Sequence, residues 1–243
     1  TRSGGAGPRL VTRTDAVQAE KGLDGRYIAL WHSHGYYFDM PLDRWEWQRA
    51  KLFGSVEDLS VMAYVVPYLA PMLENSGATV FLPRERDIQA NEVIVDNDLS
   101  TGNSVFMLQA PAIAANAGKG FLIRDTLFTG DNPFMMGTSL RISGGSALFV
   151  PDIPERGWYG VTMSYPRTQG HKGKVAIRVT HSGGVTDFTV DQSLGGGTWL
   201  WLGSFLFEEG ADAARGAVTV TGIDGSEALV DAVRFGGGMG NVA

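Results

Sequence analysis

The chain has no cysteine among its 243 residues, so disulfide bonds and thiolate-ligated metal sites are excluded. Positive charge is also scarce, because 20 Lys and Arg stand against 26 Asp and Glu. No basic stripe is available to neutralise phosphates, so a nucleic acid is not an expected partner. No apolar run approaches the ~20 residues that span a bilayer. The N-terminal stretch TRSGGAGPRL lacks the pattern of a signal peptide and is typical of an internal or processed start.

The remaining composition indicates a globular protein with a substantial core. Hydrophobic residues make up 44% of the chain and charged residues 19%. The 33 glycines fall mostly at turns and in the second half, which favours many short strands joined by tight turns. The length suits one large domain or two ordinary ones.

The first part of the chain predicts a unit of helix and parallel strands. Residues 1–24 are polar and glycine-rich and are expected to form a linker or lead-in. Residues 27–31 and 78–82 are short apolar runs typical of buried strands. A helical pattern between them runs from Ser55, a candidate cap, to the stop at residues 75–77. Strand, helix and strand in this order predict a parallel βαβ unit with a right-handed crossover.

Two further features of this region are expected. Pro67 and Pro71 lie inside the helical span and predict a kink or a break. Trp45, Gln48 and Leu52 follow Asp43 at helical spacing and predict an additional helix there. Residues 88–142 contain one candidate strand, 92–95, and otherwise predict an irregular excursion over the surface.

From residue 143 the pattern changes to short alternating runs between turn signals. These runs predict seven strands of an antiparallel β-sandwich that occupies residues 143–236, followed by a flexible return over 237–243. The expected strands are 146–150, 159–165, 174–180, 186–191, 198–207, 217–221 and 228–235.

Two resemblances extend this interpretation. The stretch IALWHSHG, followed by EDLSVMAYVVPYLAPMLENSGATVFLPRERD, resembles the start of a zinc-dependent N-acetylmuramoyl-L-alanine amidase of the Amidase_3 type. That resemblance implies an incomplete Rossmann-like α/β amidase lobe over residues 25–142. The stretches GWYGVTMSY, VTHSGGVTDFTVDQSLGGGTWLWLGSFLF and ALVDAVRFGGG resemble the golvesin C-terminal-like module. Together they resemble amidase-like exported proteins, often labelled xanthan lyase, which implies a periplasmic, secreted or cell-surface location.

The amidase resemblance implies a metal site. His34 and Glu57 would be two ligands of Zn²⁺, which activates water for attack on the amide between muramic acid and L-alanine. The alternative is that His34 is a hydrogen-bonded turn residue and Glu57 a charge at a helix start. His32, whose side chain should leave the strand on the opposite face, is expected to support the site or to be structural. His171 and His181 are expected to be structural or solvated.

The same resemblance implies substrate contacts. Arg84 and Arg86 could meet the stem-peptide carboxylates of peptidoglycan, although PRERD is more often a surface ion-pair cluster. Trp45 could contact a glycan or pack in the core. Trp158, Trp199 and Trp201 are most simply core and rim of the sandwich, with a carbohydrate platform as the alternative.

Three functions follow. The first is a zinc-dependent peptidoglycan amidase with a glycan-positioning sandwich. The second is a non-catalytic carbohydrate-binding or cell-wall scaffold protein. The third is a polysaccharide lyase, for which no pair of base and carboxylate neutraliser stands out. The family's third zinc ligand and catalytic Glu lie later in the domain than this chain extends. The chain is therefore expected to be part of a longer protein or an incomplete enzyme.

Overall fold

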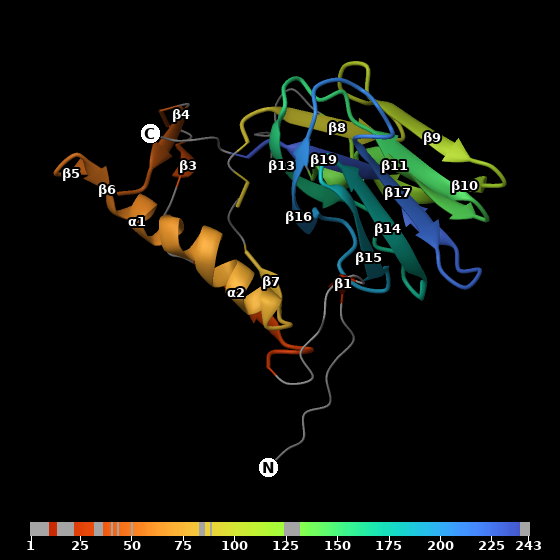
Figure 1. Cartoon of the computed structure of the whole chain (residues 1–243), viewed down its shortest axis with the longest axis horizontal. Coiled ribbons are helices and arrows are strands. Elements are labelled where there is room, and N and C mark those ends of the chain that lie inside the picture. The colour runs from red at the N-terminus through yellow and green to blue at the C-terminus, as the bar shows by residue number, and fades with distance from the viewer. Residues whose placement is uncertain are drawn as a thin grey trace, which may run out of the picture. The chain divides into compact units, whose positions relative to one another are not determined.

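The computed structural model describes residues 10–13, 22–31, 36–39, 41–42, 44–49, 51–82, 86–87, 89–123 and 132–238. The chain divides into two compact units (Figure 1). Unit 1 comprises Thr1–Pro8 and Val17–Arg86, and unit 2 comprises Arg9–Ala16 and Asp87–Ala243. No helix in the described part of the chain is long and apolar enough to cross a membrane.

Unit 2 is an antiparallel β-sandwich, as the alternating runs predicted. Its larger sheet has six strands in the order β1 (Val11–Arg13), β15 (Gly184–Asp191), β14 (Lys174–His181), β17 (Ala217–Gly222), β12 (Ser146–Val150) and β9 (Val105–Gln109). A second sheet has four strands in the order β16 (Leu200–Phe207), β13 (Gly157–Met163), β19 (Ala232–Gly236) and β8 (Glu92–Asp96). A third has three, in the order β10 (Ile113–Gly120), β11 (Gly137–Ser143) and β18 (Ala228–Val230).

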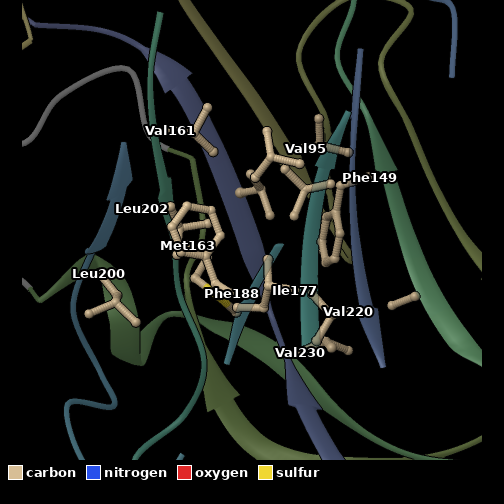
Figure 2. Packing of buried hydrophobic residues seen from close by; sticks show 14 of the residues in the cluster. Val95, Phe149, Val161, Met163, Ile177, Phe188, Leu200, Leu202, Val220 and Val230 are labelled. Atoms are coloured by element: carbon tan, nitrogen blue, oxygen red, sulfur yellow. The ribbon is translucent and has the colours of Figure 1, made fainter. Parts of the chain in front are cut away.

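Alternation along each strand fixes which side chains enter the core. On β14, Val175, Ile177 and Val179 are fully buried, whereas Lys174 and Arg178 are exposed. A period of two is the geometry of a pleated strand with one face on a core. Figure 2 shows the result, with side chains from both large sheets converging in one apolar layer. Residues of that layer include Val95, Phe149, Val161, Ile177, Phe188 and Val220.

The seventh predicted strand is divided in two. Residues 228–235 form β18 and β19, and the fully buried Asp231 separates them. β18 pairs with β11 in the three-stranded sheet, whereas β19 pairs with β13 and β8 in the four-stranded one. The other six predicted runs each correspond to one strand of the sandwich.

The prediction of an irregular excursion over residues 88–142 is wrong for the described residues. The candidate strand 92–95 is confirmed as β8, but the segment also supplies β9, β10 and most of β11, and it belongs to the sandwich unit rather than to the first lobe. β9 and β10 lie at sheet edges and expose most of their side chains, although β9 contains the apolar run VFML. The sequence IAANAGKG is too rich in small residues to show alternation.

Unit 1 contains the predicted parallel pair, but its first strand is not buried as expected, because Tyr27 and Ala29 are exposed. β2 (Tyr27–Ala29) runs parallel to β7 (Thr79–Phe81), and a helical segment connects them. That segment is α1 (Glu57–Tyr64), a π-helical turn (Val65–Leu69) and α2 (Ala70–Asn75). Pro67 lies in the π-helical turn, which is the expected interruption. Gly77, with φ of +98°, follows the helix end as the expected stop.

Other predictions for unit 1 differ from the structure. Residues 44–47 are not helical but form β4 (Arg44–Trp47), which pairs with β3 (Tyr36–Asp39). The alternating aromatic sequence RWEW favours a strand as strongly as the helical spacing favoured a helix. Ser55 lies in β6 (Ser55–Val56), paired with β5 (Lys51–Leu52), so it does not cap α1.

A Rossmann-like lobe is not shown in unit 1. Its one parallel sheet within the described ranges has two strands. Ala70, Ala78 and Val80 are buried there, with five partly buried apolar side chains around them. A doubly wound fold needs several parallel strands with helices on both faces. The observed unit therefore corresponds to a single βαβ element.

Truncation inside the sandwich tests the assignment of the core. Ile177→Ala should lower the free energy of unfolding by about 2–5 kcal/mol, because it leaves a cavity between closely packed side chains. Denaturant unfolding of the full chain measures this value. Arg178→Ala, on the next residue of the same strand, faces solvent and should change stability little. Equal effects of the two substitutions would contradict the alternation described here.

Candidate functional site

The sandwich carries a polar hollow of about 370 Å³. Its lining includes Arg141, Thr168, Gln169, His171, Lys172 and Glu227. Arg141 comes from β11, the residues from 168 to 173 come from the loop between β13 and β14, and Glu227 directly precedes β18. Three segments far apart in sequence therefore build one concave surface within unit 2.

Backbone hydrogen bonds connect the start of β14 to the residue after β15 and to the turn after β17. The amide of Gln192 donates to the carbonyl of Gly173 at 2.9 Å, and the amide of Ile223 donates to the carbonyl of Lys174 at 2.9 Å. Both segments are thus attached to the start of β14. At Gly173 an added Cβ would lie 2.4 Å from His171 Nε2 and 2.6 Å from the carbonyl oxygen of Glu227. Only glycine permits this close approach.

The charged groups of the hollow are loosely paired. Arg141 Nη1 lies 3.5 Å from Glu227 Oε2, and the two side chains are 37% and 47% exposed. The Nε atom of Arg141 is buried and has no hydrogen-bond partner among the described residues. The guanidinium therefore uses only part of its hydrogen-bonding capacity within the protein.

His171 is a neutral member of the lining at pH 7. Burial, and next the positive charge of Arg141, lower the pKa of His171 below its ordinary value of 6.5. Glu227 and Asp191 oppose this shift without reversing it. Its Nε2 atom is buried and has no hydrogen-bond partner in the described part of the chain. The imidazole contributes shape and polarity to the floor rather than charge.

The chemistry of the hollow suits a ligand rich in hydroxyl groups. Small-molecule pockets of ~300–1,000 Å³ are usually lined mainly by apolar side chains. This one is instead lined by hydroxyl, amide, imidazole and charged groups. Such groups donate and accept hydrogen bonds in several directions, which matches a sugar better than an apolar molecule.

The tryptophans of the sandwich differ in exposure. Trp199 packs against Phe121 and Phe134, with the guanidinium of Arg234 5.4 Å from its ring centroid. The ring of Trp201 lies over Gly160, where an added Cβ would meet it at 2.6 Å. Trp158 is 62% exposed. Trp199 and Trp201 are thus partly buried and Trp158 is exposed, so the expectation of a rim position fits better than that of a core position.

A second cluster of titratable groups lies where β8 meets β19. Asp231 accepts hydrogen bonds from the Phe121 amide at 3.0 Å and from Ser164 Oγ at 2.6 Å. One oxygen of the buried Asp96 accepts from the Asp98 amide at 3.1 Å, and the other has no partner among the described residues. Burial raises the pKa of Asp96 to about 8 and that of Asp231 to about 6, and the charge of Asp231 adds to the shift of Asp96.

The residues of the predicted zinc site are only partly described. His32, His34 and Arg84 lie outside the described residues. Glu57 is the first residue of α1 and is exposed, which is compatible with a ligand and equally with a charge at the helix start. Within the described ranges no group of three His, Asp or Glu side chains could hold a metal ion. The zinc site therefore stays a prediction.

The predicted substrate contacts are also untested. Arg86 Nη1 lies 2.8 Å from Glu74 Oε1, and Nη2 donates to the Val80 carbonyl at 3.3 Å. This geometry matches the ion-pair alternative for PRERD, and a contact between Arg86 and a substrate remains a prediction. Trp45 lies in strand β4 rather than on a helix.

The sequence reasoning missed the hollow. The sequence predicts a structural or solvated role for His171 and does not single out Arg141, Lys172 or Glu227. The glycine-rich loops TQGHKGK and IDGSE are visible signals, but they converge through the pairing of β14 with β17, and Arg141 joins them through the pairing of β11 with β18. For His181 the expectation of a structural role agrees with its bonds: Nδ1 accepts from the Gly183 amide and Nε2 contacts Thr186 Oγ1.

Comparisons with known proteins concern mainly the sandwich. The model of the family described as "Golvesin C-terminal domain" matches residues 130–237, a range that contains every residue of the hollow. A xanthan lyase of Bacillus sp. (strain GL1) is 33% identical over 94 residues, which are 37% of this chain and 10% of the relative. The chain thus spans about a tenth of the length of that curated relative.

Two solved structures are similar in part. The structure of a Paenibacillus xanthan lyase has 23% identity and a TM-score of 0.46, covering 60% of this chain and 13% of the other. A family 35 carbohydrate binding module from Clostridium thermocellum has 17% identity and a TM-score of 0.36, covering 60% of this chain and 98% of the module. The matched family and the curated relative identify unit 2 as containing a golvesin-like β-sandwich.

The buried carboxyl groups predict a pH dependence of stability. The folded-state pKa of Asp96 lies above its ordinary value of 3.8, so its contribution to stability is complete below about pH 4 and is lost as the pH rises toward 8. Asp96→Asn does not titrate. Thermal unfolding should therefore show a stability advantage of this variant over the native chain that grows from pH 5 to pH 8.

The matched control is Asp224→Asn, which removes the same charge at an exposed turn without touching the buried network. An advantage of Asp96→Asn that is constant with pH, or one that Asp224→Asn reproduces, would contradict the assigned titration.

Proposed function

We propose that this chain is a polysaccharide-binding protein and that its golvesin-like sandwich holds a glycan in the hollow without cleaving it. The observation that carries the proposal is the polar, concave lining built by Arg141, Gln169, Lys172 and their neighbours. All of these residues lie within the range matched by the golvesin family model. A xanthan-type polymer or peptidoglycan is the proposed partner, which would place the protein in the periplasm, at the cell surface or outside the cell.

A binding role fits the hollow better than lyase chemistry. A lyase needs a base within hydrogen-bonding reach of the proton beside a uronate carboxylate. In the hollow the candidate base is His171, and its Nε2 atom is buried against Gly173. The arrangement therefore supports recognition of a sugar rather than proton abstraction.

Native gels that contain a dissolved polysaccharide test the proposal directly. Xanthan, a neutral glucan and solubilised peptidoglycan fragments should be tried with the full chain, and at least one should retard its migration. Gln169→Ala should weaken the retention on the order of tenfold, because a hydrogen bond to the ligand is lost. The absence of retardation by every polymer would refute a glycan-binding role.

The matched control is Gln109→Ala, which truncates the same residue type at an exposed position of β9. It should bind as the native chain does. Product that absorbs in the near ultraviolet, formed from xanthan by the purified chain, would contradict the non-catalytic part of the proposal.

A zinc-dependent amidase function is the second candidate, and the parallel pairing of β2 with β7 supports it. The amidase resemblance requires a strand, a helix that begins at Glu57 and a second parallel strand, in this order. The described elements have that order. Zinc would supply activation of a water molecule, with His34 and Glu57 among its ligands. A third ligand would have to come from residues that are not described or from a longer chain.

Metal analysis of the purified full chain tests this candidate. If His34 and Glu57 are ligands, zinc should be present in stoichiometric amount and should be lost in both His34→Ala and Glu57→Gln. His181→Ala, which changes a histidine of the sandwich, should retain it. A folded native chain without zinc, and without release of stem peptides from peptidoglycan, would remove the amidase candidate.

A further inference from the structure

We propose that the hollow selects a carboxylate-bearing sugar, with Arg141 and Lys172 binding the carboxylate. This inference rests on the proposed glycan-binding function and deepens it by naming the ligand class. Four observations support it: the local charge, the incomplete pairing of Arg141, the position of Glu227 and the neutrality of His171.

The charge of the hollow opposes that of the whole chain. The chain has a formal net charge of −6 at pH 7. Among the lining residues, Arg141 and Lys172 are positive and only Glu227 is negative, so the lining has a net charge of +1 with His171 neutral. A local positive site on a negatively charged protein favours an anionic group at that place and disfavours adsorption of polyanions elsewhere.

Arg141 is less well paired than an arginine of the same sandwich. Arg178, on the outer face of β14, makes two hydrogen bonds to the Asp187 carboxylate, at 2.8 and 3.0 Å. Arg141 has Glu227 at 3.5 Å, beyond the ~2.7–2.9 Å of a charge-assisted hydrogen bond. A ligand carboxylate can therefore gain a bond to the exposed part of this guanidinium that Glu227 does not make.

Glu227 acts as a competing anion at the same guanidinium. Its Oε2 lies 3.5 Å from Arg141 Nη1, and its negative charge repels a second carboxylate. The native chain therefore has a lower affinity for an acidic sugar than the same site would have without the charge of Glu227. Removing this charge while keeping the shape of the side chain should raise the affinity for an acidic ligand and leave that for a neutral ligand unchanged.

The remaining side chains provide recognition of the sugar ring. Thr168 and Gln169 offer a hydroxyl and an amide at the rim, and Lys172 adds an ammonium group that can follow the ligand. These groups hydrogen-bond to sugar hydroxyls, whereas the planar guanidinium fork matches the two oxygens of a carboxylate. The assembly distinguishes an acidic sugar from a neutral one of the same outline.

Matched pairs of polymers test the proposal. Calorimetric titration of the full chain with xanthan, alginate and polygalacturonate should be compared with titration by the methyl-esterified form of each. At least one acidic polymer should bind on the order of tenfold more tightly than its ester, because esterification removes the charge and keeps the backbone. This preference should fall as salt is raised.

Variants assign the preference to the hollow. Arg141→Gln should lose most of the preference for the acidic polymer over its methyl ester. Glu227→Gln should increase the affinity for the acidic polymer several-fold. Lys172→Ala should weaken binding, whereas Lys174→Ala, two residues further along the chain, should not. Arg178→Gln is the control for a general loss of positive charge. Because Glu227→Gln predicts a gain, a folding defect in Arg141→Gln does not remove the test.

The outcomes separate the inference from the function on which it rests. Binding of a neutral polymer or an ester as tightly as every acidic form would overturn carboxylate selection and leave glycan binding in place. Equal losses in Arg141→Gln and Arg178→Gln, with no gain in Glu227→Gln, would also overturn it. The absence of binding to any polymer, acidic or neutral, would remove the proposed function itself.

Discussion

The burial of one face of every central strand against the opposite sheet is the constraint from which the rest of unit 2 follows. Val175, Ile177 and Val179 can enter the core only if β14 keeps its register with β15 and β17. That register determines where β14 begins, and the loop before β14 and the turn after β17 are both attached at that point. The hollow is therefore a consequence of core packing, although none of its charged groups belongs to the core. This separation lets residues at the rim change without disturbing the fold.

The buried ionisable groups of unit 2 lie at a different place from the hollow. Asp96 and Asp231 lie at the junction of β8 and β19, and burial disfavours the ionised form of both. Asp231 accepts hydrogen bonds from segments far apart in sequence, at Phe121 and Ser164, so it fixes where the last predicted strand leaves one sheet and enters the other. The network thus contributes to specifying the topology while it reduces stability at neutral and higher pH. Buried polar groups that are largely satisfied often have such a specifying role.

Much of the sandwich could be predicted from the sequence, because alternation and turn residues are local signals. The strands around Ile177, Phe188 and Val220 repeat large inward residues at a period of two, and each was predicted. β10 has no clear signal in the sequence because its side chains are small, whereas β9 contains the apolar run VFML, which is typical of a strand. The hollow could not be predicted, since Arg141 meets Glu227 only through the pairing of β11 with β18. In unit 1 the parallel pair was predicted and the segment around Trp45 was not, because aromatic alternation and helical spacing coincide there.

The placement of the hollow also explains how a binding site can be selective without being enclosed. Two loops and one strand contribute groups of opposite charge, and the long contact between Arg141 and Glu227 leaves the guanidinium incompletely satisfied. A bidentate pair, such as Arg178 with Asp187, has less to gain from a ligand carboxylate, because binding would have to replace bonds that already exist. Because the pairing of Arg141 is incomplete, its guanidinium can still form a charge-assisted hydrogen bond to a ligand carboxylate. In the proposed site, that bond adds to the affinity for the ligand. In the proposed selection of a carboxylate, Glu227 is the group with which an anionic ligand would have to compete for Arg141.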